Sequence, residues 1–335
     1  MSKEIDKIAD DIMRSAQLAA VLEVSGWPKP GNVHRTADFA DTRFEHFMAG
    51  AIALGPSIRE VAYQGIRVAQ RRLQIDEISV GKYIKDAVSE VGKSHKSGNT
   101  HLGISLLFAP LAAAAGLTAV TKKDIDSRSL RENVIKVMKA TTSEDAADAY
   151  DAINLASSAA LGRLELETVP DLSDNKAKAK LSERKISLFE VMQASAGWDN
   201  IAREWATGME ICFETGYLTL TKVYQETHDI NIATVHAFLA ILSTFPDTFI
   251  ARKVGVRETP YIGRAVEIGI RRIGWITETA GRILKEGGLA TELGHEALLE
   301  FDRKLQGAGG LYNPGTTADL TAGSLFVALL CGLRF

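Results

Sequence analysis

Apolar residues recur every three or four positions along almost the whole 335-residue chain, and this periodicity limits the possible folds more than any other feature. Such spacing places one face of an α-helix against a protein core, whereas a half-buried strand requires strict alternation. Alternation over the length of a strand is nearly absent, and so are Val- and Ile-rich runs bounded by turns. The chain is therefore expected to be all-α.

The expected helices fall into an early and a late group, separated by the polar segment 170–185. Their ranges are residues 3–22, 44–54, 58–73, 104–120, 125–139, 143–164, 188–194, 201–224, 232–245, 259–284, 292–305 and 317–330. Ser57 is placed to cap the third of them. We predict one large, bundle-like domain over residues 1–335, with a flexible charged excursion at 170–185.

The composition, with 46% hydrophobic and 24% charged residues, is that of a soluble globular protein with a sizeable core. Lys and Arg number 39 against 42 Asp and Glu, a net charge of -3, which argues against a nucleic-acid partner. Cys212 and Cys331 lie far apart and form no metal-binding pair, and residues 1–11 lack an export signal. A cytoplasmic location is expected, and the sequence leaves open whether the chain forms a homodimer.

Residues 104–120 are the one stretch that resembles a membrane span. The stretch is slightly short for that role, relies on several alanines, and contains Ser105, Pro110 and Gly116. We therefore expect a buried central helix and no membrane partner.

Residues 97–103, Ser-Gly-Asn-Thr-His-Leu-Gly, stand directly before this apolar stretch. They do not form a P-loop, because Ile and Ser follow the second glycine where Lys and then Ser or Thr are needed. Amides at the start of a helix can still bind an anion. In a plainer interpretation, Asn99 and Thr100 cap a buried helix and His101 is a core histidine.

Two further Gly/Pro turns carry charged residues. In Pro-Lys-Pro-Gly at 28–31 the prolines restrict Lys29, which reduces the entropy lost when the lysine engages a polyphosphate; the alternative is a rigid turn with a solvated lysine. In residues 313–320, Asp319 is placed in the first turn of an apolar helix. Its carboxylate suits Mg²⁺ or a ribose hydroxyl, or simply complements the helix dipole.

Residues 245–253 place Asp247, Arg252 and Lys253 within two helical turns. Without the other motifs, this segment would be interpreted as a solvated charged face. Considered together with the other motifs, the segment offers a carboxylate and cations to a bound nucleotide.

Taken together, Pro28-Lys29-Pro30-Gly31-x-Val33, Gly98-Asn99-Thr100-His101-x-Gly103 and Pro314-Gly315-x-x-Ala318-Asp319-Leu320 resemble the triphosphoribosyl-dephospho-CoA synthase family in order and spacing. The resemblance runs from about residue 23 to residue 330. It implies an all-α transferase that moves the 5-triphosphoribosyl group of ATP to the 2'-hydroxyl of 3'-dephospho-CoA, or of a related acceptor, and releases adenine. Mg²⁺ is expected to accompany ATP.

Displacing adenine from the ribose passes through a cation-like sugar, which calls for a carboxylate, a base and an acid. The resemblance and the motifs assign catalytic roles to Glu23, His101 and Asp319; nucleotide or phosphate binding to Lys29, Gly31, Gly98, Asn99, Thr100, Gly103, Arg252 and Gly315; acceptor binding to Asn32, His34 and Asp38; and metal binding to Asp247 and Asp319. Which group acts as base and which as acid stays open.

The chain departs from the family pattern in two loops. Asn32, Val33 and His34 stand where the family typically has Leu-Val-Asp, and its Gly-Ala-His before an Asp is not evident around Asp38. Because these loops would hold the acceptor, the acceptor stays open. Two other functions remain in view: a nucleotide hydrolase or phosphotransferase on the same scaffold, and a non-catalytic nucleotide-binding protein.

Overall fold

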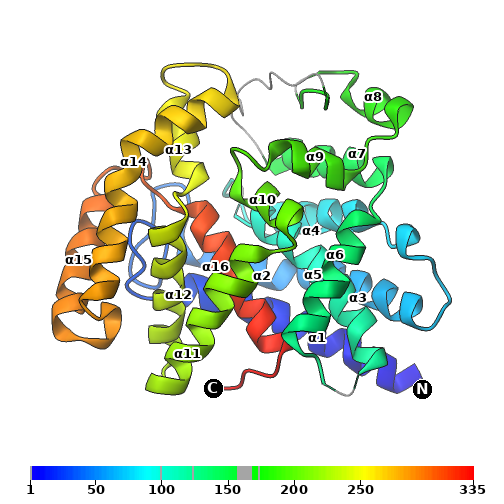
Figure 1. Cartoon of the computed structure of the whole chain (residues 1–335), viewed down its shortest axis with the longest axis horizontal. Coiled ribbons are helices and arrows are strands. Elements are labelled where there is room, and N and C mark those ends of the chain that lie inside the picture. The colour runs from blue at the N-terminus through cyan, green and yellow to red at the C-terminus, as the bar shows by residue number, and fades with distance from the viewer. Residues whose placement is uncertain (1, 99, 123, 157–167, 173) are drawn as a thin grey trace.

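The computed structural model describes residues 2–98, 100–122, 124–156, 168–172 and 174–335, and within these residues every regular element is helical (Figure 1). The α-helices are α1 Ser2–Ser25, α2 Phe44–Ala53, α3 Gly55–Ala69, α4 Val80–Ser94, α5 Leu102–Thr121, α6 Ser127–Lys139, α7 Ser143–Ala156, α8 Ala177–Arg184, α9 Leu188–Ser195, α10 Asn200–Thr207, α11 Tyr217–Thr227, α12 Ile230–Thr244, α13 Thr248–Gly255, α14 Ile262–Lys285, α15 Glu292–Gln306 and α16 Gly315–Leu330. Short 3₁₀ segments lie at η1 Ile75–Glu77 and η3 Gly288–Ala290, and η2 Ile211–Gly216 is a π-helix. The all-α prediction is confirmed.

Helix α5 is the centre of the larger core. Every residue from 104 to 116 is buried, and α1, α3, α4, α6 and α16 pack around the helix. By length and composition α5 could cross a membrane, yet 78% of its most apolar window is buried inside the protein. The expectation of a buried central helix is confirmed.

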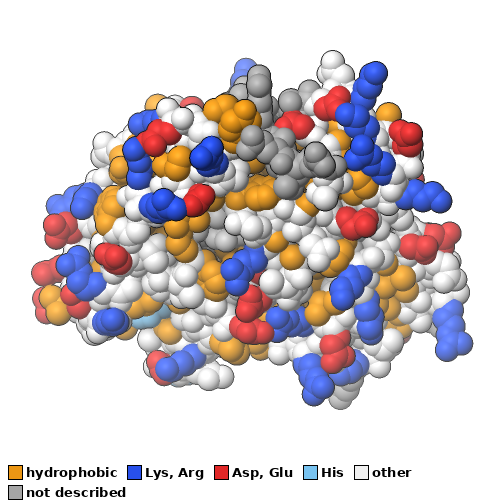
Figure 2. All heavy atoms as spheres, turned by 45° about the horizontal axis from the view of Figure 1, so that its top comes forward, with side chains coloured by type: hydrophobic (Ala, Val, Ile, Leu, Met, Phe, Trp, Pro, Cys, Tyr) orange, Lys and Arg blue, Asp and Glu red, His pale blue; other side chains and the backbone are white. Residues whose placement is uncertain are grey.

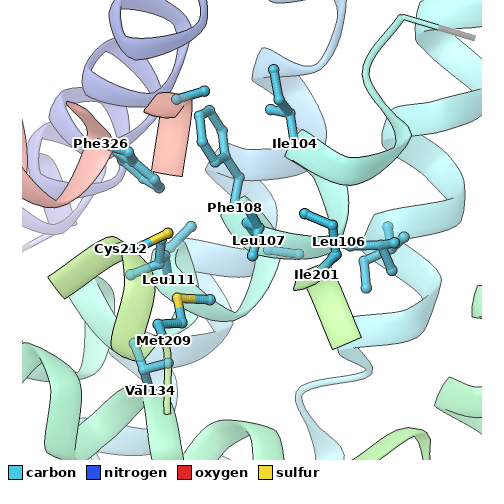
Figure 3. Close-up of a cluster of buried hydrophobic side chains, with 14 of the residues drawn as sticks. Ile104, Leu106, Leu107, Phe108, Leu111, Val134, Ile201, Met209, Cys212 and Phe326 are labelled. Atoms are coloured by element: carbon cyan, nitrogen blue, oxygen red, sulfur yellow. The ribbon is translucent and has the colours of Figure 1, made fainter. Parts of the chain in front are cut away.

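Two apolar cores share α12 and α16. In the larger one, the rings of Phe108 on α5 and Phe326 on α16 lie 4.7 Å apart between centroids. Cys212 lies near these rings, and Met209 lies beside Leu111 and Val134 (Figure 3). The smaller core is formed by α12 to α15 together with Ala318 of α16, and it includes Phe238. Figure 1 shows α13, α14 and α15 on one side of α12 and α16, and α3 to α9 on the other.

Three local predictions differ from the structure. Helix α4 was not expected, although Val80, Ile84 and Val91 have helical spacing and are buried. The single helix expected over 201–224 is interrupted by η2, after Gly208 and Met209 with φ of +68° and +57°. Ser57 does not cap α3: the helix begins at Gly55, so Ser57 lies inside its first turn.

The polar segment between the two groups of helices contains α8. Ala177 and Leu181 are buried there, while most of the charged side chains around them remain exposed. The part of the expected helix beyond Ala156, up to residue 164, lies outside the described residues. On the face in Figure 2, Lys and Arg side chains alternate with Asp and Glu over the surface.

Candidate active site

Lys29 lies in the loop that follows α1 and is wholly buried, with 0% of its side chain exposed, so the solvated lysine of the plainer interpretation does not occur. Its Nζ donates to a carboxylate oxygen of Glu23 and, at 2.9 Å, to the Glu23 carbonyl oxygen. The ring of Phe238 on α12 faces the ammonium group, with its centroid 5.9 Å from Nζ. The motif therefore delivers an ion pair to the boundary between the two cores.

Burial acts against the charge on both partners. It raises the pKa of Glu23 and lowers the pKa of Lys29, although the contact between them works in the opposite direction. When Asp319 is ionised, its negative charge further favours the ammonium form of Lys29. Glu23, Lys29 and Asp319, assigned from separate motifs, thus act on one another in the fold.

The loop that carries Lys29 is held at its first residue by α12. The side-chain oxygen of Asn231 accepts from the backbone amide of Trp27 at 2.8 Å, and its amide nitrogen donates to the Trp27 carbonyl at 2.6 Å. Arg35 donates to the same Asn231 oxygen at 2.9 Å. One side chain of α12 therefore fixes both ends of the loop.

Asp302 on α15 holds the middle of this loop. One carboxylate oxygen accepts from the amide of Gly31 at 2.9 Å, and the other lies 3.1 Å from His34 Nε2. Because the Thr36 amide donates to His34 Nδ1, the neutral imidazole carries its proton on Nε2 and donates it to Asp302. Gly31 has φ of +74°, which favours glycine at that position.

The three residues assigned to the acceptor lie in different settings. Asn32 and His34 are buried, and Asn32 donates to Asn313 Oδ1 at 2.8 Å, which ties its loop to the turn before α16. Asp38 is exposed and accepts from the Phe44 amide at 2.7 Å, at the start of α2. Contact of these residues with an acceptor stays a prediction.

Asp319 lies against the start of α5. A Cβ atom on Gly103 would lie 2.0 Å from Asp319 Oδ2, so only glycine leaves room for the carboxylate, and the Ile104 amide donates to it. Because α16 begins at Gly315, Asp319 is in the second turn and not in the first, as the sequence had suggested. A simple dipole interaction with its own helix is therefore weak, since that effect falls off within the first turn.

Burial raises the pKa of Asp319 well above its ordinary value, and the negative charges of Glu23, Asp247 and Asp199 add to the effect. Its surroundings therefore favour the neutral form of the Asp319 carboxyl group. A carboxylic acid kept neutral in this way can donate a proton to a leaving group.

Asp247 joins the starts of two helices. Its Oδ1 caps α13 by accepting from the Ile250 amide at 2.9 Å, and its Oδ2 accepts from the amide and hydroxyl of Thr317 at 2.7 and 2.8 Å. These bonds engage both oxygens, and the assignment of Asp247 as a metal ligand stays a prediction. Burial raises its pKa.

Helix α10 starts beside the same junction. Asp199 caps α10 through Oδ1, and the amide of Asn200 donates to the hydroxyl of Thr248 in α13 at 3.2 Å. With the contact between Asp319 and α5, the N-termini of α5, α10, α13 and α16 are linked in one region. Helix N-termini favour bound anions, but a carboxylate of this chain already accepts from an amide at each of these four, and binding of a polyphosphate here stays a prediction.

Helix α13 also carries two cations. Arg252 packs on the ring of Phe249, while Lys253 Nζ donates to the Gly310 carbonyl at 2.6 Å. Burial lowers the pKa of Lys253 to about 8. The ring of Phe249 packs against Gly315 at the start of α16. Lys253 and Arg252 both lie over the ring of Phe249, and phosphate binding by Arg252 stays a prediction.

His101 stands at the N-cap position of α5 and is 1% exposed. Its Nδ1 lies 2.8 Å from the hydroxyl of Thr100, and burial lowers the pKa of the imidazole to about 3. Because of this low pKa, His101 is neutral at physiological pH. Of the other residues in this motif, Gly98 is exposed, and Asn99 lies outside the described residues.

Among the residues that the structure describes, no three His, Cys, Asp or Glu side chains are grouped to hold a metal ion. In nucleotide sites Mg²⁺ commonly takes one or two carboxylates together with substrate phosphates. The Asp319 carboxylate can serve as one of these Mg²⁺ ligands only when it is ionised.

Several residues that organise the site were not found from the sequence. Asp302 and Asn231 act through contacts with residues far away along the chain, which periodicity does not reveal. Asp199 carries a local signal, because an Asp directly before a helical stretch is a common N-cap.

Comparison with known proteins gives concordant matches. A family model described as ATP:dephospho-CoA triphosphoribosyl transferase matches residues 9–334. A Klebsiella pneumoniae protein named 2-(5''-triphosphoribosyl)-3'-dephosphocoenzyme-A synthase is 22% identical over 333 residues, which cover 96% of this chain and 91% of that protein. A crystal structure from Archaeoglobus fulgidus, provisionally named a triphosphoribosyl-dephospho-CoA synthase, is similar with a TM-score of 0.60 and 27% identity, covering 87% of this chain and 100% of that one.

Proposed function

Because the chain belongs to the ATP:dephospho-CoA triphosphoribosyl transferase family, we propose that it transfers the 5-triphosphoribosyl group of ATP to the 2'-hydroxyl of 3'-dephospho-CoA and releases adenine. One observation supports placing this reaction at the candidate site. Residues from all three sequence motifs meet: Asp319 packs against Gly103 and acts electrostatically on Lys29. The curated relative whose name states this synthase activity matches along nearly the whole chain.

The reaction breaks the bond between adenine and ribose C1' and forms a bond between C1' and the acceptor oxygen. The acceptor hydroxyl loses a proton and the departing adenine gains one. We assign Asp319, whose neutral form is favoured by its burial, as the donor to adenine. Glu23, held by Lys29, stabilises the cation-like sugar, and His101 takes the proton of the acceptor hydroxyl.

The triphosphate stays intact and positions the ribose. We assign its binding to the N-termini of α5, α10, α13 and α16, with Arg252 and Lys253 as cations. Mg²⁺, entering with ATP, neutralises part of the triphosphate charge.

The test is to incubate the protein with ATP, Mg²⁺ and dephospho-CoA and to identify the products. We expect free adenine together with the triphosphoribosylated acceptor. ADP or AMP without adenine would indicate a hydrolase or phosphotransferase instead. Thermal protection by ATP without turnover would indicate a nucleotide-binding protein.

A pair of glycine variants tests the placement of the site. Gly103→Ala would push the Asp319 carboxylate away, and we expect adenine release to fall by about 10²-fold or more, the scale of a lost acid–base group. Gly92→Ala on α4 is the matched control, because its new Cβ would meet nothing within 4 Å. Asp319→Asn, which keeps the size of the side chain, should reproduce the loss. Full activity of Asp319→Asn would contradict the role given to this carboxyl group.

A further inference from the structure

Helix α16, which carries Asp319, has no side-chain cap of its own. The helix begins at Gly315, and its N-cap residue is Pro314, whose side chain has no hydrogen-bond acceptor. Asp247, which stands directly before α13, supplies the missing cap: its Oδ2 accepts from the amide of Thr317, the third residue of α16, at 2.7 Å. An N-cap side chain normally accepts from the second or third amide of its own helix. Asp247 therefore performs this role for a neighbouring helix.

The same carboxylate also caps α13 in the ordinary way. Its Oδ1 accepts from the amide of Ile250, the third residue of α13, at 2.9 Å. Its Oδ2 accepts a second bond from α16, donated by the hydroxyl of Thr317 at 2.8 Å. Because one side chain binds the same position of both helices, Asp247 fixes the start of α16 relative to the start of α13.

Asp247 and Asp319 differ in their access to a ligand. Asp247 is 1% exposed, and its three hydrogen bonds engage both carboxylate oxygens. In α16, by contrast, every residue from 316 to 330 is buried except Asp319, which is partly exposed. A substrate can therefore reach the Asp319 side chain, whereas Asp247 is enclosed by the protein.

The cap lies close enough to Asp319 to set its position. The rise of an α-helix places Asp319 only about 3 Å further along the axis than Thr317. On the other side, the Asp319 carboxyl group occupies the space that a Cβ on Gly103 would need, and it accepts from the Ile104 amide. A slide or rotation of the start of α16 would disturb both contacts. Misplacement of a reacting group by about 1 Å can lower a rate by about 10²-fold.

We propose that Asp247 is a positioning residue that holds the Asp319 carboxyl group against the start of α5 for the reaction, a role that rests on the function proposed above. Asp247 acts through the amide and hydroxyl of Thr317 and contacts neither substrate nor metal. This role takes the place of the metal binding that the sequence predicted for Asp247.

Asp247→Asn keeps the size of the side chain but cannot accept from both helices, because one of its two polar atoms is now a donor. We expect the kcat for adenine release to fall by about 10²-fold. Thr317→Val removes only the hydroxyl bond and keeps the shape of the side chain, so we expect a smaller fall of about tenfold. Thr317→Ser restores the hydroxyl and should retain most of the activity.

Asp145→Asn is the matched control, because Asp145 makes the same three bonds elsewhere in the fold. Its Oδ1 accepts from the Gly81 amide in α4 at 2.8 Å, and its Oδ2 accepts from the amide and hydroxyl of Thr142, directly before α7, at 2.7 and 2.9 Å. Like Asp247, this side chain is buried. The control should lower the midpoint of urea unfolding as Asp247→Asn does, but keep its kcat. An equal fall in kcat in the two variants would overturn the positioning role.

The Mg²⁺ dependence of turnover separates positioning from metal binding. If Asp247 acts only through Asp319, then Asp247→Asn and Thr317→Val disturb the same group and should need the same Mg²⁺ concentration for half of their maximal rate. A raised requirement confined to Asp247→Asn would show that Asp247 binds the metal, and would overturn the proposal.

A spectroscopic readout tests the positioning role without turnover. In protein labelled with ¹⁵N-isoleucine, the Ile250 amide reports its bond to Asp247, and the Ile104 amide reports its bond to Asp319. In Thr317→Val we expect the Ile104 resonance to move while the Ile250 resonance stays near its wild-type position, because the cap of α13 is kept. In Thr317→Ser both resonances should stay in place.

The same spectra keep this proposal distinct from the proposed function. An Ile104 resonance that is unmoved in both Thr317→Val and Asp247→Asn would overturn the positioning role, even in a protein whose wild type releases adenine. If the wild type releases no adenine but the Ile104 resonance responds as expected, the proposed function is contradicted and the positioning of Asp319 by Asp247 stands.

Discussion

The ion pair between Glu23 and Lys29 is the most costly arrangement at the scale of single residues. Both side chains are removed from water, so each charge depends on the other for compensation. Asn231 and Asp302 hold the loop that supplies the lysine, which keeps the two groups together. Because a buried ion pair is weak evidence for folding stability, we explain this pair by a role in the reaction.

Lys29→Met should destabilise the fold, because it leaves the Glu23 carboxylate buried without its partner. We expect a loss of about 3–5 kcal/mol in the free energy of unfolding by urea titration. The double variant Glu23→Gln with Lys29→Met should recover a large part of that loss while remaining inactive in adenine release. Lys82→Met, which breaks the exposed pair with Asp86, is the control and should cost less than about 1 kcal/mol. A loss no larger than the control's would show that the pair carries no buried charge.

The sequence identified the residues that meet at the site better than it identified what holds them. Lys29, Gly103 and Asp319 were found because each stands in a Gly- or Pro-containing turn beside a helix. Asp302 lies 271 positions from the Gly31 amide that it binds, in a helix with no local feature of a site. A contact of that range arises from packing, which neither spacing nor local propensity encodes.

At the scale of the helices, η2 is the main irregularity in the core. Glu204 of α10 accepts from the amides of Ile211 and Cys212, both at 2.8 Å, and so caps the π-helix from within the protein. Cys212 then packs against α16, where its sulfur lies 3.5 Å from the Leu320 carbonyl. The Glu204 carboxylate thereby positions η2 against α16, the helix that carries Asp319.

Burial raises the pKa of Glu204 to about 7 from an ordinary value of 4.5. Because the pKa is higher in the folded state, the stabilising contribution of this group is fully present below about pH 4.5 and is lost as the pH rises through about 7. We expect the cost of Glu204→Gln in unfolding free energy to shrink by roughly 3 kcal/mol between pH 4.5 and pH 8. Urea titrations at several pH values measure this difference. Glu190→Gln, at the exposed cap of α9, is the control, and a cost for Glu204→Gln that stayed constant would contradict the shifted pKa.

Helix boundaries followed from the sequence where apolar spacing met a clear stop, as in α14. The interruption at η2 did not, because its apolar spacing continues across Gly208 and only the buried carboxylate of Glu204 reveals where the chain turns. Helix α4 was missed although Val80, Ile84, Ala87 and Val91 recur every three or four positions, so its local sequence did carry the helical signal. Only the break at η2 is decided by tertiary contacts rather than by propensity.

At the scale of the whole molecule, the candidate site lies where the two apolar cores meet. Phe238, which faces Lys29, belongs to the smaller core, as does Ala318, while Leu320 belongs to the larger one. Asp319 therefore stands between residues of the two cores. A ligand bound at this position would contact helices from both sides and restrain them relative to each other.

Hydrogen exchange should reveal this restraint. With ATP, Mg²⁺ and dephospho-CoA at about 100 times their Kd, we expect exchange to slow by up to about 100-fold in amides that open through release of the ligand. The protected amides should lie at the starts of α5, α10, α13 and α16, together with the loop that carries Lys29. Amides of α8, which packs on α7, serve as the internal control and should be unchanged. Protection on only one side of α16 would place the ligand within a single core and contradict a site between the two.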